Sequence, residues 1–495
     1  MARDFVLAID QGTTNSKAVL IDRTGNVVAR GTAPAPVYHP QPGWVEQNPV
    51  ELWQSVVQAL AQCTVGIGAD QVAVLGVSSQ RESVLAWHAT SGEALGPCVS
   101  WQCRRTASVC DQLRSEGHQD DVIARTGLPL DPMFPATKVA WLLANVRRTR
   151  PHVTESDICI GTVDSWLLWQ LTGGKRHACD ESNAARTQLY NIGEGRWDEA
   201  LGDLFGIPST VLPEVLPSDA DFGVTLGVPG VPDGIRIHAM LGDSHAALFG
   251  HGVTAPGMVK ATYGTGSSLM TLINGFAVPE GGITTTIAWS RGSERTYALE
   301  GNILVSGASL PWAAELLGLG GDVAALSKLA QTVTDTAGVF FVPALVGLGA
   351  PYWDSSATGL FTGMSFSTGP AQLALAVFEA LTFQITDVLG VMRAQAARPF
   401  SCLLADGGAS SNPFVMQLQA DRADLPVRTS EVPEASARGA AFMAGLSVGF
   451  WDDFGDIPAL HQKAAQFDPT MPAALRRQKR TSWRRAVARA RYKPE

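Results

Sequence analysis

Apolar runs separated by short polar turns dominate the first thirty residues of the chain. Residues 5–9 and 18–21 are apolar and rich in β-branched residues, and they flank a polar stretch at residues 10–17 with the sequence Asp-Gln-Gly-Thr-Thr-Asn-Ser-Lys. Two such runs around a short polar tip predict a β-hairpin. A second turn at residues 25–26, followed by the apolar residues 27–29, extends the hairpin into a three-stranded antiparallel meander.

The pattern then alternates between helical and strand periods. Apolar residues recur at helical spacing over residues 50–66, and residues 72–77 form a continuous apolar run that predicts a buried strand. Residues 235–241 predict another strand that runs directly into a helix at residues 243–250. Helices between strands indicate α/β layering.

The second half of the chain repeats the order of sequence features found in the first. Residues 257–267 give a strand followed by glycine and hydroxyl residues in alternation, as at the opening hairpin. Residues 371–394 have the spacing of a core helix, and the Arg-rich tail at 475–493 predicts a terminal helix with one docked apolar stripe. At 495 residues the chain is too long for one core. We predict two domains, at 1–250 and 251–495.

Composition narrows the classes of function. Hydrophobic residues make up 45% and charged residues 17% of the chain, as in an ordinary globular protein. A net charge of -9 argues against general nucleic-acid binding. The seven cysteines show no metal-ligand spacing, which favours buried thiols in a reducing compartment. With no apolar run long enough for a membrane span, we expect a cytoplasmic protein with neither a membrane nor a nucleic acid as partner.

The tip of the opening hairpin offers groups that suit a triphosphate. Thr13, Thr14 and Lys17 supply hydroxyl donors and charge, and Asp10 at the strand end is placed to face Mg²⁺. Thr265 and Gly266 form the corresponding tip in the second half, so two phosphate loops would hold one nucleotide. The alternative for each tip is an ordinary polar turn. Neither a GxxxxGK[ST] loop nor a GxGxxG loop opening a helix occurs, which weighs against the P-loop and Rossmann nucleotide folds.

Several polar groups follow the predicted strands. Arg81 and Glu82 come just after residues 72–77 and form a donor and acceptor pair suited to the hydroxyls of a polyol; alternatively they are a surface ion pair. Trp101 is either a pocket wall or a core residue. Asp243 begins the helix after residues 235–241, where an aspartate is also a common N-cap. The polar segment at 180–187 is expected at the surface or in a cleft.

Many of these motifs together resemble one known family. The segments Ile-Asp-Gln-Gly-Thr-Thr at 9–14, Gln-Arg-Glu at 80–82, and Trp-Gln-x-Arg-Arg-Thr at 101–106 look like the FGGY carbohydrate kinases, within them the glycerol kinase branch. The likeness continues in order through residues 126–141, 161–167, 299–308 and 340–354. It therefore covers nearly the whole chain.

The resemblance implies a fold, a reaction and residue roles. The fold would be a two-domain actin-like ATPase (ribonuclease H-like) fold with an interdomain catalytic cleft. ATP and Mg²⁺ would bind in it, and Asp243 would act as the general base and, with Asp10, face the metal. Hydroxyls of a polyol or sugar would meet Arg81, Glu82 and Trp101. The matching positions for the nucleotide in the second half are Gly307, Gly408 and Asn412, besides Thr265 and Gly266.

Departures from the family pattern bear on the acceptor. Met133 stands where the glycerol kinases have tyrosine, and Ser244 stands where they have glutamine, so the pocket loses two long polar side chains. Lys17, Cys103 and Pro311 also depart, with consequences that the sequence does not define. We predict ATP-dependent phosphorylation of a primary hydroxyl of glycerol or a larger C4–C5 polyol.

Two alternatives stay open. One is a kinase of a ketose such as a xylulose-like pentulose, which would also fill the roomier pocket. The other, from a different class, is an actin-like ATPase that senses or moves without phosphorylating a small molecule. A homodimer or larger homo-oligomer is expected.

Overall fold

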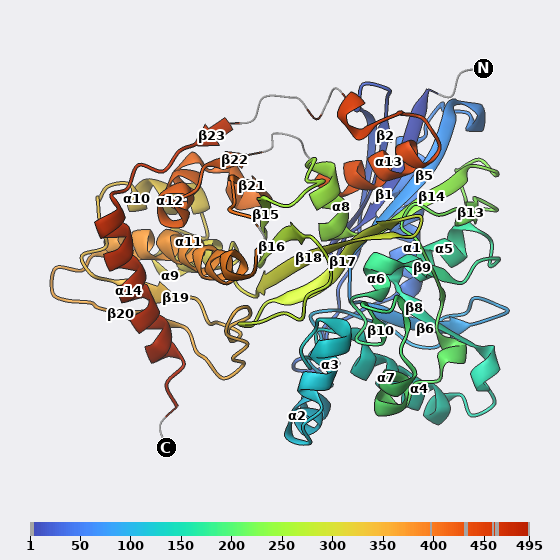
Figure 1. The fold of residues 1–495 in the computed structure, drawn as a ribbon, viewed down its shortest axis with the longest axis horizontal. Helices are drawn as coiled ribbons and strands as arrows, with labels where there is room; N and C mark the ends of the chain where they lie inside the picture. The colour runs from blue at the N-terminus through green and yellow to red at the C-terminus, as the bar shows by residue number, and fades with distance from the viewer. Residues whose placement is uncertain (1–3, 397, 430–433, 458–459, 461–464, 494–495) are drawn as a thin grey trace.

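Two mixed sheets organise the computed structural model, which describes residues 4–396, 398–429, 434–457, 460 and 465–493. The first sheet has the strand order β13-β14-β5-β1-β2-β3 and the second has the order β17-β18-β16-β15-β21-β22-β23. We call the part built on the first sheet the first lobe and the part built on the second sheet the second lobe; they occupy opposite sides of Figure 1.

The first sheet contains the predicted meander and the buried strands that follow it. Strands β1, β2 and β3 pair antiparallel, whereas β5 and β14 run parallel to β1. The bounds are β1 Phe5–Gln11, β2 Asn15–Ile21, β3 Val27–Pro34, β5 Val72–Ser79, β13 Gly223–Val224 and β14 Arg236–Gly242. The predicted meander is confirmed.

The second sheet repeats this topology. Strands β15, β16 and β18 pair antiparallel, and β21 and β22 run parallel to β15. The bounds are β15 Met258–Tyr263, β16 Ser267–Ile273, β17 Thr284–Arg291, β18 Glu294–Ile303, β21 Cys402–Asp406, β22 Val427–Thr429 and β23 Ala465–Phe467. The two lobes are therefore built on equivalent strands.

Helices cover the sheets and pack the lobes together. Helices α8 and α13 contact each other, and α13 also packs on β1, β5 and β14, although it comes from late in the chain. One apolar cluster combines residues of β1, α8 and α13 with residues of β16, β17 and β18. The helices are α1 Pro49–Cys63, α2 Ala107–Ser115, α3 Gln119–Thr126, α4 Pro135–Thr149, α5 Val163–Leu171, α6 Glu181–Ala184, α7 Glu199–Phe205, α8 Asp243–Gly250, α9 Ser309–Leu316, α10 Val323–Ala330, α11 Pro370–Gln395, α12 Pro413–Ala423, α13 Ala435–Ser447 and α14 Ala473–Ala490.

Smaller sheets complete the lobes. A sheet with the order β4-β7-β6-β8 lies below the first sheet, and the pairs β9 with β12, β10 with β11, and β19 with β20 are short. Their bounds are β4 Glu46–Gln47, β6 Val84–His88, β7 Cys98–Val99, β8 Ile158–Thr162, β9 Ala178–Asp180, β10 Tyr190–Asn191, β11 Arg196–Trp197, β12 Glu214–Leu216, β19 Phe340–Val342 and β20 Leu360–Thr362.

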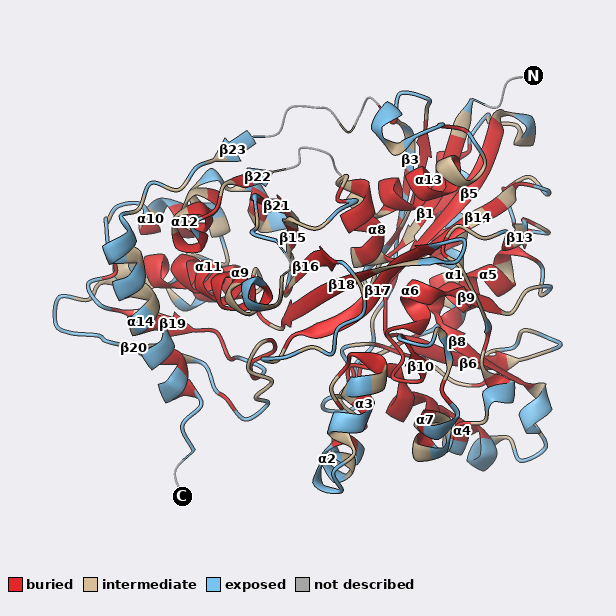
Figure 2. Cartoon of the chain, in the orientation of Figure 1, coloured by how far each residue is buried: buried red, intermediate tan, exposed pale blue. Residues whose placement is uncertain are grey.

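Burial agrees with most of the sequence expectations (Figure 2). Helix α11 is long and apolar enough to cross a membrane, but 89% of its most apolar window is buried, so it is the predicted core helix. Helix α14 docks through Trp483, Ala486 and Val487, as its stripe predicts. The seven cysteines are buried and unpaired, as expected.

One expectation about burial is wrong. The segment at 180–187 is buried throughout rather than lying at the surface or in a cleft, because its charged side chains have partners inside the protein. Helix α5 is also buried, and Gln170 is its one residue of intermediate exposure.

Candidate active site

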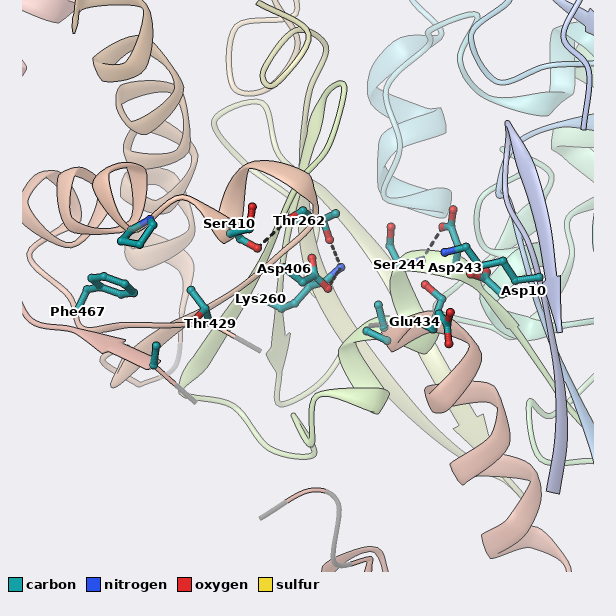
Figure 3. Close-up of a pocket in the computed structure, with 18 residues that line it drawn as sticks. Asp10, Asp243, Ser244, Lys260, Thr262, Asp406, Ser410, Thr429, Glu434 and Phe467 are labelled. Carbon is teal, nitrogen blue, oxygen red and sulfur yellow. Dashed lines mark hydrogen bonds and ion pairs between the residues drawn. The ribbon is translucent and has the colours of Figure 1, made fainter. Parts of the chain in front are cut away.

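A cavity of about 850 Å³ lies between the lobes at the strand ends that carry the two hairpin tips. Figure 3 shows first-lobe residues on one side of it, including Asp10, Asp243 and Ser244, and second-lobe residues on the other. The cavity is lined by Asp10, Lys17, Asp243, Ser244, Ala247, Lys260, Thr262, Asp406, Gly407, Ser410, Ser411, Pro413, Thr429, Glu434, Ala435, Ser436, Ala465 and Phe467. Cations, carboxylates and hydroxyls thus face one cleft from both lobes.

The first-lobe side of this cleft is crowded with carboxylates. Burial raises the pKa of Asp10 to about 6, and the nearby charges of Asp243 and Glu434 add to the rise. Lys17, directly opposite Asp10 in the hairpin register, and Ser78, whose hydroxyl donates to Asp10 Oδ1 at 3.2 Å, oppose the rise without cancelling it. The protein's own cations therefore leave the Asp10 carboxylate incompletely compensated, as a site for an added cation would be.

The second-lobe side is compensated. Asp406 Oδ2 lies 2.7 Å from His251 Nε2 and 3.8 Å from Lys260 Nζ. Although burial favours the neutral acid, Lys260 and His251 outweigh it and hold the pKa of Asp406 below its ordinary value. Lys260 also donates to the hydroxyl of Thr262. This side presents a fixed cation and hydroxyls to the cleft.

Asp243 stands at the start of α8, directly after β14. Its Oδ1 accepts a hydrogen bond from Arg81 Nε at 3.1 Å and from the backbone N–H of Ser244 at 2.6 Å. The Asp243 side chain keeps 36% of its surface exposed, whereas Arg81 keeps 5%. A carboxylate held by a buried guanidinium and open to the cleft can accept a proton from a bound hydroxyl.

Arg81 belongs to a buried network of ion pairs. Its Nη2 donates to Ser244 Oγ at 3.1 Å and to Glu300 Oε1 at 2.7 Å. Arg186 Nε donates to Glu82 Oε1 at 2.6 Å, and Arg186 Nη1 lies 2.7 Å from Glu300 Oε2. Arg81 and Glu82 are therefore not a surface ion pair.

Glu82 has an unusual backbone. Its φ of 60° lies in the left-handed region, which non-glycine residues rarely adopt. The buried ammonium of Lys138 donates to the carbonyls of Glu82 at 2.8 Å, Met133 at 2.7 Å and Ser100 at 3.3 Å. Such strain is often retained at functional sites, and here one lysine holds the loops that carry Glu82, Trp101 and Met133.

A second cavity of about 340 Å³ adjoins these loops. Trp101, Met133, Thr265 and Gly266 all line it, so it contains predicted residues from both lobes. Trp101 Nε1 donates to Thr13 Oγ1 at 2.9 Å. Trp101 is thus a pocket wall whose indole N–H is tied to the first hairpin tip.

The remaining predicted nucleotide residues lie outside the described cavity linings. Thr14 is exposed beside the hairpin tip, and Gly307 donates its backbone N–H to Gly264 at 2.9 Å, next to Thr265. Gly408 follows the cavity residue Gly407, and a side chain there would meet open space. Asn412 caps α12 by accepting from the Phe414 N–H, and its amide donates to Ser327 Oγ at 3.1 Å.

Sequence reasoning missed other residues of the site. Lys260 and Thr262 alternate along β15 toward the second tip and face the cleft, which was a usable signal. Asp406 immediately precedes the glycine pair at 407–408. Glu300 and Arg186 carried no local signal, because their charged partners lie more than a hundred positions away.

No group of three or more His, Cys, Asp or Glu side chains in the described residues could hold a metal ion by itself. Magnesium commonly binds through one or two carboxylates together with the phosphates of a nucleotide. Asp10 and Asp243 fit that requirement, since they face the same cleft and the charge of Asp243 contributes to the raised pKa of Asp10.

The comparisons identify the family. Residues 5–250 match the N-terminal domain of the FGGY family of carbohydrate kinases, and residues 259–448 match its C-terminal domain. The chain belongs to this family. The predicted actin-like, two-domain α/β fold and the expected ATP-dependent carbohydrate kinase activity are thereby confirmed.

Relatives of this FGGY kinase span the whole chain. It is 44% identical over 497 residues to an apulose kinase of Pectobacterium atrosepticum, with 100% of both chains covered. It is also 44% identical over 492 residues to a glycerol kinase of Thermus brockianus, with 98% of both covered. The crystal structure of Plasmodium falciparum glycerol kinase with ADP superimposes with a TM-score of 0.91 at 28% identity, covering 99% of each chain. The predicted membership of the glycerol kinase branch is confirmed.

Proposed function

We propose that the protein transfers the γ-phosphoryl group of ATP to a primary hydroxyl of a small polyol or ketose, with Asp243 as the general base. The observation that carries this proposal is the position of Asp243, which is open to the interlobe cleft and held by the buried Arg81 at 3.1 Å. Phosphoryl transfer needs an acceptor hydroxyl in line with the γ-phosphorus and a group to take its proton.

Residues of both lobes would bind the nucleotide. Lys17 from the first lobe and Lys260 from the second face the cleft and would neutralise the phosphates, helped by the hydroxyl of Thr262. Thr13, Thr14, Thr265 and Gly266 remain proposed phosphate contacts of the two tips. Gly307, Gly408 and Asn412 remain proposed contacts of the nucleoside, in a region that the lining residues Gly407 and Ser410 border.

The acceptor would lie between Asp243, the Arg81–Glu82 pair and Trp101. Both described hydrogen bonds of Asp243 are made by Oδ1, so we assign the proton-accepting role to Oδ2. Arg81 and Glu82 would orient the hydroxyls, and Trp101 would exclude water from one face. Positioning of this kind supplies most of the rate enhancement in phosphoryl transfer.

Magnesium fits the acidic side of the cleft. Asp10 and Asp243 would hold it, directly or through water, together with the nucleotide phosphates. The bound metal would supply charge neutralisation on the β- and γ-phosphate oxygens. The incompletely compensated charge at Asp10, with its pKa raised to about 6 mainly by burial, supports this assignment.

A second acceptor class, a ketose, is favoured by the pocket and by one relative. Met133 contributes an apolar side chain to the second cavity. Ser244 is a short residue whose hydroxyl accepts a hydrogen bond from Arg81 at 3.1 Å. Neither residue has a long polar side chain that could bind the hydroxyls of an acceptor as small as glycerol. The similarity to an apulose kinase, whose substrate name denotes a ketose, supports an acceptor larger than glycerol.

The test is ADP release on a panel of acceptors. Glycerol, four- and five-carbon polyols and pentuloses are each added to the enzyme with MgATP, and phosphomonoester formation is checked by ³¹P NMR. Stimulation by one acceptor with matching phosphomonoester supports the proposal. Equal ATP hydrolysis with and without every acceptor contradicts it and supports the non-kinase ATPase alternative.

The assembly and the compartment remain predictions. We propose a homodimer or larger homo-oligomer, which light scattering coupled to size-exclusion chromatography would test. We also propose a cytoplasmic location and no nucleic-acid or membrane partner.

A further inference from the structure

Glu300 is a buried carboxylate of the second lobe that reaches into the first. It lies on β18, which Figure 1 shows between the two lobes, and its side chain is fully buried. Its Oε1 accepts from Arg81 Nη2 at 2.7 Å and from Ser268 Oγ at 3.1 Å. Its Oε2 lies 2.7 Å from Arg186 Nη1. One second-lobe carboxylate therefore binds two first-lobe guanidinium groups.

The two arginines lead to the two ends of the proposed acceptor site. Arg81 Nε donates to Asp243 at 3.1 Å, and Arg186 Nε donates to Glu82 at 2.6 Å. The proposed base and the proposed hydroxyl-binding carboxylate are thus joined through Glu300. Of the five groups in this chain of contacts, Glu300 is the one that belongs to the second sheet.

The charges explain why Glu300 matters for position. Arg81 interacts with the charges of Glu300, Glu82 and Asp243. Without the Glu300 charge, two buried guanidinium groups would face each other, and Arg81 would be drawn more strongly toward Asp243 and Glu82. Removing one partner of a buried ion pair leaves an uncompensated charge that the surroundings must accommodate by moving. A shift of about 1 Å at a base can lower a rate about 100-fold.

We propose that Glu300 is a positioning residue, which through Arg81 and Arg186 sets Asp243 and Glu82 in their working geometry only while the lobes are apposed. The acceptor site is then completed by a second-lobe residue that does not touch the acceptor. This inference rests on the proposed function.

The test is Glu300→Gln, which keeps the size of the side chain but removes its charge and turns an amide toward an arginine. We expect kcat/KM for the acceptor to fall about 100-fold, while the KM for ATP changes less than threefold. A merely structural role would not separate the two substrates in this way.

Glu379→Gln is the matched control. Glu379 on α11 is also buried and also binds two cations, Arg422 Nη2 at 2.5 Å and Lys479 Nζ at 2.9 Å, but lies outside the described cleft lining. We expect this variant to lose stability in thermal unfolding and to keep kcat/KM for both substrates within threefold of the wild type.

Ser268→Ala provides a second test of the inference in case Glu300→Gln does not fold. It removes only the hydroxyl that donates to Glu300 Oε1 and should lower kcat/KM for the acceptor about fivefold, in the same substrate-selective way, as expected for one hydrogen bond. The inference is overturned if Glu300→Gln folds and keeps kcat/KM for the acceptor within threefold of the wild type, if it raises the KM for ATP as much as it lowers kcat/KM for the acceptor, or, should it not fold, if Ser268→Ala has no effect. A wild-type enzyme that no acceptor stimulates would instead overturn the proposed function.

Discussion

The two hairpins that face the cleft share one scaffold and carry opposite chemistry. In the first lobe, β1 pairs antiparallel with β2 and parallel with β5; in the second lobe, β15 pairs in the same way with β16 and β21. The register places Asp10 of β1 beside Ser78 of β5. At the equivalent point, Thr262 of β15 lies beside Asp406 of β21. The carboxylate and the hydroxyl have changed places between equivalent strands.

The exchange gives the two carboxylates opposite electrostatics. Asp10 stands among other acids and has its pKa raised to about 6 by burial and by those acids. Asp406 is held by Lys260 and His251, which keep its pKa below the ordinary value in spite of burial. Topology therefore fixes where a charge can stand, and the neighbours decide its role. The carboxylates of the first lobe are suited to an added cation and to accepting a proton, in addition to the phosphate contacts proposed for its hairpin tip, whereas the second lobe offers phosphate contacts without such a carboxylate.

Asp243→Asn should give the largest effect, because it removes the proposed proton acceptor from the first-lobe side. We expect kcat to fall by about 10²–10⁴, with the Kd for ATP changed less than threefold because the second-lobe cations remain. Calorimetric titration with ATP in the absence of magnesium, which Asp243 would also help to hold, and steady-state kinetics measure the two quantities. Loss of ATP binding together with turnover would show that Asp243 holds the nucleotide rather than the acceptor proton.

Asp406→Asn and Asp10→Asn should change stability in opposite directions. Asp406→Asn leaves the buried Lys260 without its acceptor charge and should destabilise the apo enzyme by about 3 kcal/mol. Asp10→Asn removes a poorly compensated charge and should stabilise it at pH 8 by about 1–2 kcal/mol, less than the full shift implies because Asp10 is partly exposed. Chemical denaturation without nucleotide or metal measures both. If both variants change the free energy of unfolding in the same direction, the proposed electrostatic contrast between the two hairpins is wrong.

The same pair should differ in pH dependence. The folded pKa of Asp10, about 6, is above the ordinary value of 3.8, so the folded state holds this proton more tightly. The Asp10 contribution to stability is therefore complete below pH 4 and is lost as the pH rises past 6. For Asp406 the folded pKa is lowered, so its contribution is present above pH 4 and is lost on acidification. Stability differences between wild type and each variant should be measured from pH 2 to 8; the Asp10 difference should change between pH 4 and 6, and the Asp406 difference should change with the opposite slope below pH 4.

Lys138→Met should lower acceptor use by up to about 100-fold in kcat/KM, because three loop carbonyls lose the ammonium that aligns Glu82, Trp101 and Met133. Burial lowers the pKa of Lys138 to about 8, with Glu82 opposing the shift. The wild-type KM for the acceptor should therefore rise above pH 8, and this rise should be absent in the variant. An unchanged acceptor KM in both measurements would mean that the loops hold their positions without Lys138.

What the sequence could predict followed from local pattern. The meander, the buried strand before Arg81 and the core helix α11 come from residue spacing alone, and the strand ends then bring Asp10, Lys17 and Asp243 to one cleft. The buried network could not be predicted. Glu300 meets Arg81 across 219 positions, and Arg186 meets Glu82 across 104.

The error at residues 180–187 has the same origin. The rule that charged residues are exposed fails where charges are paired, and the ion-pair partners of this segment are distant in the chain. Arg186 donates a hydrogen bond to Glu82, and Glu181 accepts a hydrogen bond from Arg295 of the second lobe at 2.7 Å. Pattern therefore predicts elements and strand ends, while pairing across the lobes is visible only in three dimensions.

The smallest effect concerns the acceptor alone. Met133→Tyr with Ser244→Gln restores two long polar side chains next to Trp101 and Arg81, which would narrow the pocket and bind the hydroxyls of a short polyol. We expect the ratio of kcat/KM for glycerol to kcat/KM for a five-carbon acceptor to rise about tenfold, the range that one or two pocket contacts commonly give. The KM for ATP should not change, since the second-lobe hairpin is untouched. If the ratio stays constant, Met133 and Ser244 do not determine the preferred size of the acceptor. The buried ion-pair network that holds Arg81 and Glu82 would then be the next determinant to test.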